Sequence, residues 1–334
     1  MQNRFSSSTD VLAQSKGGRS KAPVFVLGSV RSGTTLLYHM LLSSGGFAVY
    51  RTESNAINLL EPRFGDLSNL GNRKKLMKAW LDSKLFKVSG LEASSIEKKV
   101  LAEVSNGGNF LRTVMEEIAH KQGVDRWADC TPDHLAYIDR IKQTIPDALI
   151  IHIIRDGRDV ALSMEKQKWV KPLPWDQHRP FIASAAYWDW IVRKGRSDGL
   201  RYSKDYCEVR FEELVQDPRR VLAGLSEFIE HDLDYDRIQA NGIGSVSEPN
   251  TSFASASFNP VGRWRESLSE AELAELEGMV GDTLRELGYP LANERPVNLR
   301  SLRNSYHRYF DFKLWLKSRT PAGRFLVTKN LSWL

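Results

Sequence analysis

A glycine-rich turn that follows a short apolar run is the first part of the sequence that could do chemistry. It reads Gly28-Ser-Val-Arg31-Ser32-Gly33-Thr34-Thr35 and continues into Leu36. The glycine spacing is that of a Walker A loop, in which backbone N–H groups and a helix N-terminus bind phosphate. Thr34 stands where that loop has its lysine, and Arg31 supplies a cation instead. The turn suits an anion that needs neither that lysine nor Mg²⁺, although a plain strand-to-helix connection can have the same pattern.

A second cationic loop follows the apolar run from Ala148 to Ile154. It begins with Arg155-Asp156-Gly157-Arg158-Asp159, and Ser163 lies about two helical turns after Arg155. An arginine fork and a serine hydroxyl can bind a second phosphate. Taken alone, the segment could equally be a solvated charge cluster at a helix start. Two such loops on one sheet edge favour a ligand with two anionic groups.

These loops require strands and helices that bring them together. Each loop joins a buried apolar run, 22–27 or 148–154, to a helical pattern, and two such units predict an α/β fold with a parallel sheet covered by helices on both faces. A further strand is expected at 208–211. Helices are expected at 73–87, 109–122, 218–230 and 269–287, and Ser269 with Glu272 has the spacing of a capping box. The stretch 241–260 is expected to be a ligand-binding loop.

Four segments, in this order, resemble the sulfotransferases that use 3′-phosphoadenosine 5′-phosphosulfate (PAPS). They are Pro23 to Leu37, Ile153 to Val160 with Ser163, Arg210-Phe-Glu-Glu-Leu214, and Gly262-Arg263-Trp264. The Arg-Ser-Gly-Thr-Thr form of the first segment is closer to the bacterial and tyrosylprotein branch than to the cytosolic small-phenol branch, whose loop carries a lysine. The resemblance implies a P-loop NTPase-like sulfotransferase fold over residues 22–290.

The resemblance also implies roles for the matching residues. The 5′-phosphosulfate of PAPS would contact Arg31, Ser32, Gly33, Thr34, Thr35 and Leu36, with Arg31 nearest the bridging oxygen. Arg155 and Ser163 would bind the 3′-phosphate, and Gly262, Arg263 and Trp264 would cover the nucleotide. No metal is implied.

Glu53 follows the first loop by about twenty residues, close to the place where the tyrosylprotein branch has its general base. The resemblance therefore makes Glu53 the candidate base, whereas a surface carboxylate in a loop is the alternative reading. His134 and Asp133 are the next candidates for the base. Related sequences often have Glu-Lys-Thr-Pro where this chain has Asp129-Cys130-Thr131-Pro132, so Cys130 replaces a lysine that assists the leaving phosphate.

The implied activity is transfer of the sulfuryl group from PAPS to an acceptor hydroxyl on a carbohydrate, a lipid-linked molecule or a peptide tyrosine. Two alternatives remain open: a nucleotide-dependent phosphotransferase, disfavoured by the absent Walker lysine, and a non-catalytic nucleotide- or lipid-binding protein of the same fold. Core packing is the default reading of a group of aromatic residues, Trp169, Trp175, Tyr187, Trp188 and Trp190. The alternative is that Trp169 and Trp175 line an acceptor cleft.

The composition of the chain excludes several classes of protein. The chain has 334 residues, of which 41% are hydrophobic and two are cysteines, which excludes a fibrous repeat and a disulfide framework. Residues 1–21 are polar and are expected to be a disordered lead-in without a secretory signal. No apolar run is long enough to span a membrane. These features predict a cytoplasmic enzyme.

A basic, aromatic C-terminal tail accounts for the positive charge of the chain. Residues 295–334 hold nine Lys and Arg and one Asp, a net charge of +8 where the whole chain has +6. The rest of the protein is therefore nearly neutral, and binding of nucleic acid is not expected. Within the tail, 291–334, the spacing of Tyr306, Phe310 and Leu314 predicts a helix packed on the body. Peripheral contact with a membrane, or attraction of an acidic acceptor, are the alternatives. The oligomeric state is left open.

Overall fold

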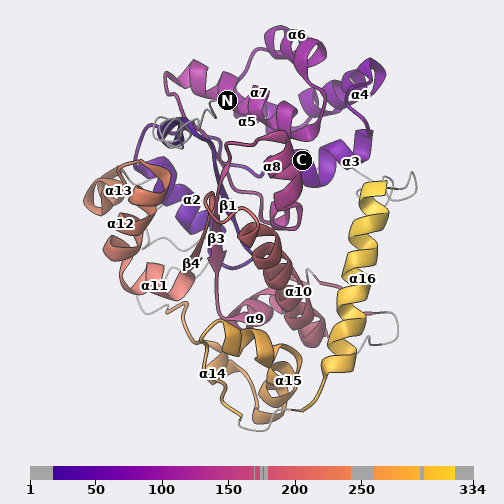
Figure 1. Cartoon of the computed structure of the whole chain (residues 1–334), viewed down its shortest axis with the longest axis vertical. Helices are drawn as coiled ribbons and strands as arrows, with labels where there is room; N and C mark the ends of the chain where they lie inside the picture. Colours follow the sequence, from indigo (N-terminus) through magenta and orange to yellow (C-terminus); the bar gives the residue numbers. More distant parts are fainter. Residues whose placement is uncertain are drawn as a thin grey trace, which may run out of the picture.

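A four-stranded parallel sheet lies at the centre of the computed structural model, which describes residues 18–168, 170–173, 176, 180–241, 259–293 and 297–319 (Figure 1). The strands are β1 (Val24–Leu27), β2 (Ala128–Asp129), β3 (Leu149–Ile154) and β4 (Tyr206–Arg210), in the order β2-β1-β3-β4. Val24 pairs with Leu149 and Leu27 with His152, so β1 and β3 run side by side and end at the same edge. The two cationic loops predicted from the sequence therefore begin next to each other.

Both faces of the sheet are buried. Along β1, Val24 and Val26 belong to one apolar cluster, whereas Phe25 and Leu27 belong to another. Because side chains alternate between the faces of a strand, this division shows that helices cover each side. The first cluster lies against α2 (Thr34–Ser43) and α12 (Pro218–Ile229), and the second includes α10 (Pro180–Leu200). The predicted α/β fold, with helices on both faces of a parallel sheet, is confirmed.

The remaining helices frame this core. They are the 3₁₀ helices η1 (Arg19–Lys21) and η3 (Pro132–Tyr137), the π-helix η2 (Ala56–Leu60), and the α-helices α3 (Glu61–Phe64), α4 (Leu70–Leu81), α5 (Lys84–Ser89), α6 (Ala93–Glu103), α7 (Gly107–Gln122), α8 (Ile138–Thr144), α9 (Gly157–Gln167), α11 (Phe211–Gln216), α13 (Tyr235–Asn241), α14 (Trp264–Ser267), α15 (Glu270–Glu286) and α16 (Arg300–Arg319).

Most expected elements lie where the sequence pattern places them, with two differences. The strand expected at 208–211 is β4, which ends at Arg210 because Phe211 begins α11. The single helix predicted over 73–87 is two helices, α4 and α5, because Ser83 ends the first and caps the second by accepting a hydrogen bond from the amide of Phe86. The capping box of α15 is present, with Ser269 and Glu272 each bonded to the other's backbone. Helix caps of this kind satisfy N–H groups that the helix itself cannot.

The C-terminal segment packs on the body through α16, which runs along α10 and α15 (Figure 1). Tyr306 is fully buried and Phe310 is 6% exposed, as their spacing predicts. Trp190 of α10 donates a hydrogen bond from Nε1 to Asp311, 2.8 Å away. The basic segment is therefore partly a structural helix with one apolar face.

The segment expected to be a disordered lead-in includes four described residues, 18–21. Arg19–Lys21 form η1, and Arg19 donates a hydrogen bond to the carbonyl of Phe228 at 2.9 Å. The carbonyl of Arg19 accepts one from Arg126 at 2.8 Å. Among the helices that the structure describes, none is long and apolar enough to cross a bilayer.

Candidate active site

Two residues of the glycine-rich loop between β1 and α2 have a positive φ, a conformation that glycine adopts more easily than other residues. Gly33 has φ of +93°, and Arg31 has φ of +70°. A Cβ atom at Gly33 would lie 2.3 Å from Cδ2 of Phe211, so a side chain there would meet both backbone strain and a collision. The close approach of Phe211 explains why this position is glycine, and it places α11 directly against the loop.

Thr34, Thr35 and Leu36 form the first turn of α2. The N–H groups of a first helical turn have no acceptor within the helix, and the helix dipole makes this end electropositive. These residues therefore add backbone donors to the loop, in the arrangement that the glycine spacing predicts.

Three arginines from three separate segments meet at this edge of the sheet. Nε of Arg31 donates to Oγ of Ser163 at 2.8 Å, and Nη1 of Arg155 donates to the carbonyl oxygen of Arg31 at 3.0 Å. Burial is the main cause that lowers the pKa of Arg155; the negative charges of Asp159 and Glu212 raise it, and the positive charges of Arg263 and Arg31 lower it. Burial also lowers the pKa of Arg31. A cluster of like charges at a buried position favours an anion that relieves their repulsion.

Two buried polar atoms in this cluster have no hydrogen-bond partner among the described residues. They are Oγ of Ser32, whose side chain is fully buried, and Nε of Arg155, whose side chain is 8% exposed. Buried polar atoms are nearly always paired, so unpaired donors beside a phosphate-loop backbone fit a ligand with anionic oxygens. The side chain of Arg155 lies over the ring of Phe211, 4.6 Å from its centroid, which fixes the guanidinium plane.

The loop that begins α14 is held against the second cationic loop by Asp159. Its carboxylate accepts hydrogen bonds from the amides of Gly262 at 2.8 Å and Trp264 at 3.0 Å. Arg158 lies over the ring of Trp264, 3.8 Å from its centroid. The late segment singled out in the sequence, Gly262-Arg263-Trp264, is thereby brought next to Arg155.

Arg158 itself is a structural residue. It is 1% exposed and forms ion pairs with Asp156 and Glu277, each at 2.8 Å, and it donates to the carbonyl of Pro290 at 2.9 Å. Glu212 supports the same loop by accepting from the amide of Asp156 at 2.8 Å. Sequence reasoning did not give Glu212, Glu277 or Phe211 individual roles, although Phe211 and Glu212 lie within one of the four family-like segments.

Glu53 lies near two other acidic side chains, Asp129 and Asp133. Its side chain reaches solvent, but its surroundings desolvate the carboxyl group in part and raise its pKa to about 7, with Asp133 and Asp129 raising it further through their negative charge. A carboxyl group with a pKa near neutral pH is suited to general-base chemistry.

His134, named as an alternative base, is engaged in the core. Its ring accepts a hydrogen bond at Nε2 from the amide of Ile57 (3.3 Å), so Nδ1 carries the proton and donates to Asp129 at 2.9 Å. The side chain is fully buried. This arrangement fixes the start of η2 to β2, and it argues for a positioning role in which His134 holds the segment that carries Glu53.

Cys130 lies beside the glycine-rich loop. The thiol has a hydrogen bond with the side chain of Thr34, and burial raises its pKa well above the usual range. The thiol is therefore neutral at physiological pH. The position where related sequences often have lysine does face the loop, but it carries no charge here.

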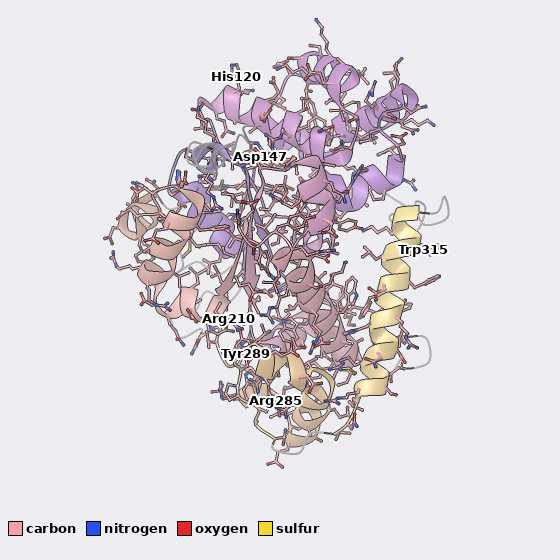
Figure 2. The ribbon with its side chains drawn as sticks, in the orientation of Figure 1. His120, Asp147, Arg210, Arg285, Tyr289 and Trp315 are labelled. Atoms are coloured by element: carbon pink, nitrogen blue, oxygen red, sulfur yellow. The ribbon has the colours of Figure 1, made fainter. Side chains whose placement is uncertain are left out.

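Of the expected tryptophans, Trp188 is fully buried and donates from Nε1 to the carbonyl of Arg155 at 3.2 Å. Trp169, Trp175 and residues 242–258 of the expected ligand loop lie outside the described residues. Figure 2 shows Arg210, the last residue of β4, beside Tyr289, and its guanidinium lies 5.0 Å from the centroid of the Tyr289 ring. Arg210 also donates a hydrogen bond to the carbonyl of Leu287, so it holds β4 to the turn that follows α15. Within the described residues, no three His, Cys, Asp or Glu side chains are grouped so that they could hold a metal ion.

Comparisons with solved structures agree with this architecture. The sulfotransferase domain from the curacin biosynthetic pathway superposes with a TM-score of 0.53 at 17% identity, covering 81% of this chain and 98% of that domain. A sulfotransferase from Mycobacterium avium gives 0.44 at 15% identity, covering 85% of this chain and 82% of that one. Retinol dehydratase in complex with retinol and PAP gives 0.39 at 14% identity, covering 79% and 81%. At these identities the first of the three shows a shared fold.

A comparison of sequences carries the assignment further. No curated protein matches the chain. The profile of the Sulfotransferase family matches residues 23–235, which is more than half of the chain and includes the glycine-rich loop, Glu53, Arg155 and Ser163. The chain therefore belongs to the sulfotransferase family.

Proposed function

We propose that this protein transfers the sulfuryl group of PAPS to the hydroxyl group of an acceptor. The observation that carries the proposal is the convergence of Arg31, Arg155 and Arg263 beside a phosphate-loop backbone, with Oγ of Ser32 buried and unpaired among the described residues. PAPS has a 5′-phosphosulfate and a 3′-phosphate, so it offers separate anionic groups to the loop after β1 and to the loop after β3.

Each residue of the cluster has a role in binding the donor. The loop amides, the hydroxyls of Thr34 and Thr35 and the guanidinium of Arg31 would bind the 5′-phosphosulfate. Arg155 and Ser163 would bind the 3′-phosphate, with Arg263 closing over the nucleotide. Because Arg31 now donates to Ser163, donor binding would exchange part of that contact for contacts with phosphate oxygens.

The transfer step is an in-line displacement at sulfur. The bond between sulfur and the bridging oxygen of the donor breaks, the acceptor oxygen bonds to sulfur, and negative charge builds up on the leaving phosphate, much as in phosphoryl transfer. Arg31 is placed to stabilise that charge. Glu53 would take the proton of the acceptor hydroxyl, so that the products are the sulfate ester, 3′,5′-ADP and a protonated Glu53.

Cys130 is the observation that keeps a second candidate open. Its neutral thiol contacts Thr34 where related sequences often supply a lysine, so the loop of this chain has less positive charge to offer the leaving phosphate. A protein of the same fold that binds the nucleotide without turnover is therefore the alternative. A Mg²⁺-dependent phosphotransferase is disfavoured by Thr34 in place of the Walker lysine.

The melting temperature of the protein with 3′,5′-ADP, ATP plus Mg²⁺, or 5′-AMP tests the proposal. A ligand that binds only the folded state raises the melting temperature, by an amount set by its affinity. We expect a rise with 3′,5′-ADP that exceeds the rise with the other two, because it alone carries both the 5′- and 3′-phosphates of the donor. An equal rise with ATP would favour the phosphotransferase, and no rise would overturn the two-phosphate site. Selective binding without turnover of PAPS would leave the non-catalytic alternative.

A further inference from the structure

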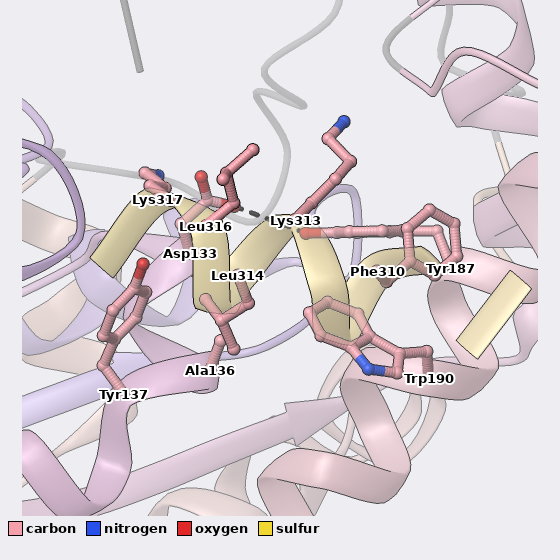
Figure 3. A pocket seen from close by; sticks show the side chains of 10 residues that line it. All are labelled: Asp133, Ala136, Tyr137, Tyr187, Trp190, Phe310, Lys313, Leu314, Leu316 and Lys317. Carbon is pink, nitrogen blue, oxygen red and sulfur yellow. Dashed lines mark hydrogen bonds between the residues drawn. The ribbon is translucent and has the colours of Figure 1, made fainter. Parts of the chain in front are cut away.

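A pocket of about 310 Å³ opens where α16 crosses α10 and η3 (Figure 3). It is lined by Asp133, Ala136 and Tyr137 from η3, by Tyr187 and Trp190 from α10, and by Phe310, Lys313, Leu314, Leu316 and Lys317 from α16. Its size lies at the lower end of the range for small-molecule sites. One wall comes from α16, which lies outside the segment matched by the family profile.

The body of the pocket is aromatic. The rings of Tyr187, Trp190 and Phe310 pack around one another with centroids 5.4–5.7 Å apart. Tyr187 is held in place at its other end, where the hydroxyl donates to Asp133 at 3.4 Å. Fixed aromatic rings beside leucine side chains provide a contact surface for a flat or apolar group.

One end of the pocket is close to the candidate base. The backbone amide of Ser54, the residue after Glu53, donates a hydrogen bond to Oγ1 of Thr131 at 3.0 Å. Thr131 lies two residues before Asp133, which lines the pocket and raises the pKa of Glu53 through its negative charge. The end of the pocket at Asp133 is therefore close to the segment that carries the residue proposed to deprotonate the acceptor.

The pocket has more positive charge than its one carboxylate balances. Lys313 and Lys317 both line it. Lys313 is an exposed residue whose ammonium lies 5.3 Å from the centroid of the Tyr309 ring, and partial desolvation is the main cause that lowers the pKa of both lysines. Lys171 lowers the pKa of Lys313 further, and Lys313 lowers that of Lys317, whereas Asp133 raises that of Lys317. The lining of the pocket thus holds two ammonium groups and one carboxylate, a net positive charge that favours an anionic ligand.

We propose that this pocket binds the acceptor, and that the acceptor is a hydroxyl compound with a compact aromatic body and one anionic group, held between Lys313 and Lys317. The inference rests on the proposed sulfuryl transfer, since it names the class of molecule that receives the group. The aromatic walls bind the body, the two lysines bind the anion, and the hydroxyl is directed toward Glu53. Helix α16 is then the element that sets acceptor specificity.

Three phenols of similar size and different charge test this inference. They are 3-(4-hydroxyphenyl)propionate, 4-propylphenol and tyramine, which carry a negative, no and a positive charge. With protein saturated by 3′,5′-ADP, calorimetry should show binding of the acid at least tenfold tighter than that of the amine, with the neutral phenol between them. With PAPS as donor, kcat/KM should follow the same order. Equal affinity for the three, or no saturable binding of the acid at millimolar concentration, would overturn the inference.

Substitutions in the pocket test whether the preference for the acid arises there. Reversing two charges in Lys313→Glu/Lys317→Glu should lower the preference for the acid over 4-propylphenol at least tenfold. The control is Arg308→Glu, which reverses a charge at an exposed position of the same helix outside the pocket and should leave the preference within twofold. Leu314→Trp should fill the pocket and raise the KM of every phenol. An unchanged preference in the double variant would place the acceptor elsewhere.

Different results would contradict the proposed sulfuryl transfer and the proposed acceptor pocket. If 3′,5′-ADP does not raise the melting temperature, the proposed transfer fails whatever the phenols do. If 3′,5′-ADP binds and the phenols are sulfated without the charge preference, the transfer stands and the inference about the pocket is wrong.

Discussion

Arg31 is the cation of the glycine-rich loop, and its positive φ and its hydrogen bond to Ser163 direct its side chain toward the second loop. Because the thiol of Cys130 is neutral, the proposed transfer would rely on the arginine cluster for the positive charge that a lysine would bring to the leaving phosphate. Arg31 is the member of that cluster within the loop itself. Its removal is therefore the most direct test of the site at the residue scale.

Arg31→Ala should lower kcat/KM for sulfuryl transfer by about a hundredfold or more, the usual effect of removing a group that stabilises charge in the transition state. The melting temperature should stay within a few degrees of the parent protein, because the side chain is half-buried and its neighbours can bind water. Arg219→Ala is the matched control, since Arg219 forms an exposed ion pair with Asp236. Normal turnover in Arg31→Ala would remove the residue from the mechanism.

The pH dependence of transfer should report on Glu53. The base must be unprotonated, and its pKa is raised to about 7, so kcat should be low at acid pH, rise through about pH 7 and reach a plateau above it. Glu53→Gln should retain binding of 3′,5′-ADP while kcat falls by roughly 10²–10⁴. The measurement is the kcat profile between pH 5 and 9. A kcat that stays constant between pH 5 and 9 would show that no group with a pKa near 7 has to lose its proton for transfer.

The conformation of the glycine-rich loop depends on how closely α11 packs against it. Gly33 combines a left-handed backbone with a ring of Phe211 where a Cβ atom would go, whereas Gly45 has φ of +84° and open space around the corresponding position. The two positions therefore separate backbone strain from collision. Both glycines have a positive φ, but only Gly33 has a side chain next to the position of a Cβ atom.

Gly45→Ala should cost about 1–2 kcal/mol of unfolding free energy, the cost of a left-handed non-glycine residue. Gly33→Ala should cost more, since Phe211 and the loop must also move apart, and it should abolish the rise in melting temperature with 3′,5′-ADP. Denaturant unfolding of the two variants measures the difference. Equal costs would mean that Phe211 can be displaced freely.

The elements near the sheet were predictable because their signals are local. The apolar runs 22–27 and 148–154 contain β1 and β3, and the spacing of Tyr306, Phe310 and Leu314 predicted α16. That spacing identifies the apolar face of a helix but not the partner that covers it, so the pocket between α16 and α10 could not be predicted. The ion pair of Arg158 with Glu277 joins residues far apart in sequence, and neither residue differs locally from a surface charge.

Arg158 joins parts of the molecule that are far apart in sequence. Its ion pairs and its hydrogen bond to the carbonyl of Pro290 connect the start of α9 to α15 and to the turn after α15. Helices α14 and α15 pack beside α9 and α10 at this point (Figure 1). Glu277 also accepts from the amides of Ala292 and Asn293, at 2.8 and 2.9 Å. The network is buried, so its members depend on one another.

Arg158→Ala should lower the unfolding free energy by about 3–5 kcal/mol, because it leaves the buried carboxylates of Asp156 and Glu277 without their cation. Arg285→Ala is the control, as Arg285 is exposed and its contact with Asp282 is 3.6 Å long. Its effect should stay below about 1 kcal/mol. Calorimetric or denaturant unfolding distinguishes the two, and similar small losses would show that the network adds little.

Because α16 forms one wall of the pocket, acceptor specificity can evolve separately from donor binding. The residues assigned to the donor lie between Gly28 and Trp264, whereas the two lysines of the pocket lie on a helix that starts at Arg300. Recombination or drift confined to that last stretch of the gene can exchange one alcohol for another while the machinery that handles the nucleotide is inherited intact. Close relatives that differ mainly after residue 300 would then sulfate different compounds with the same chemistry.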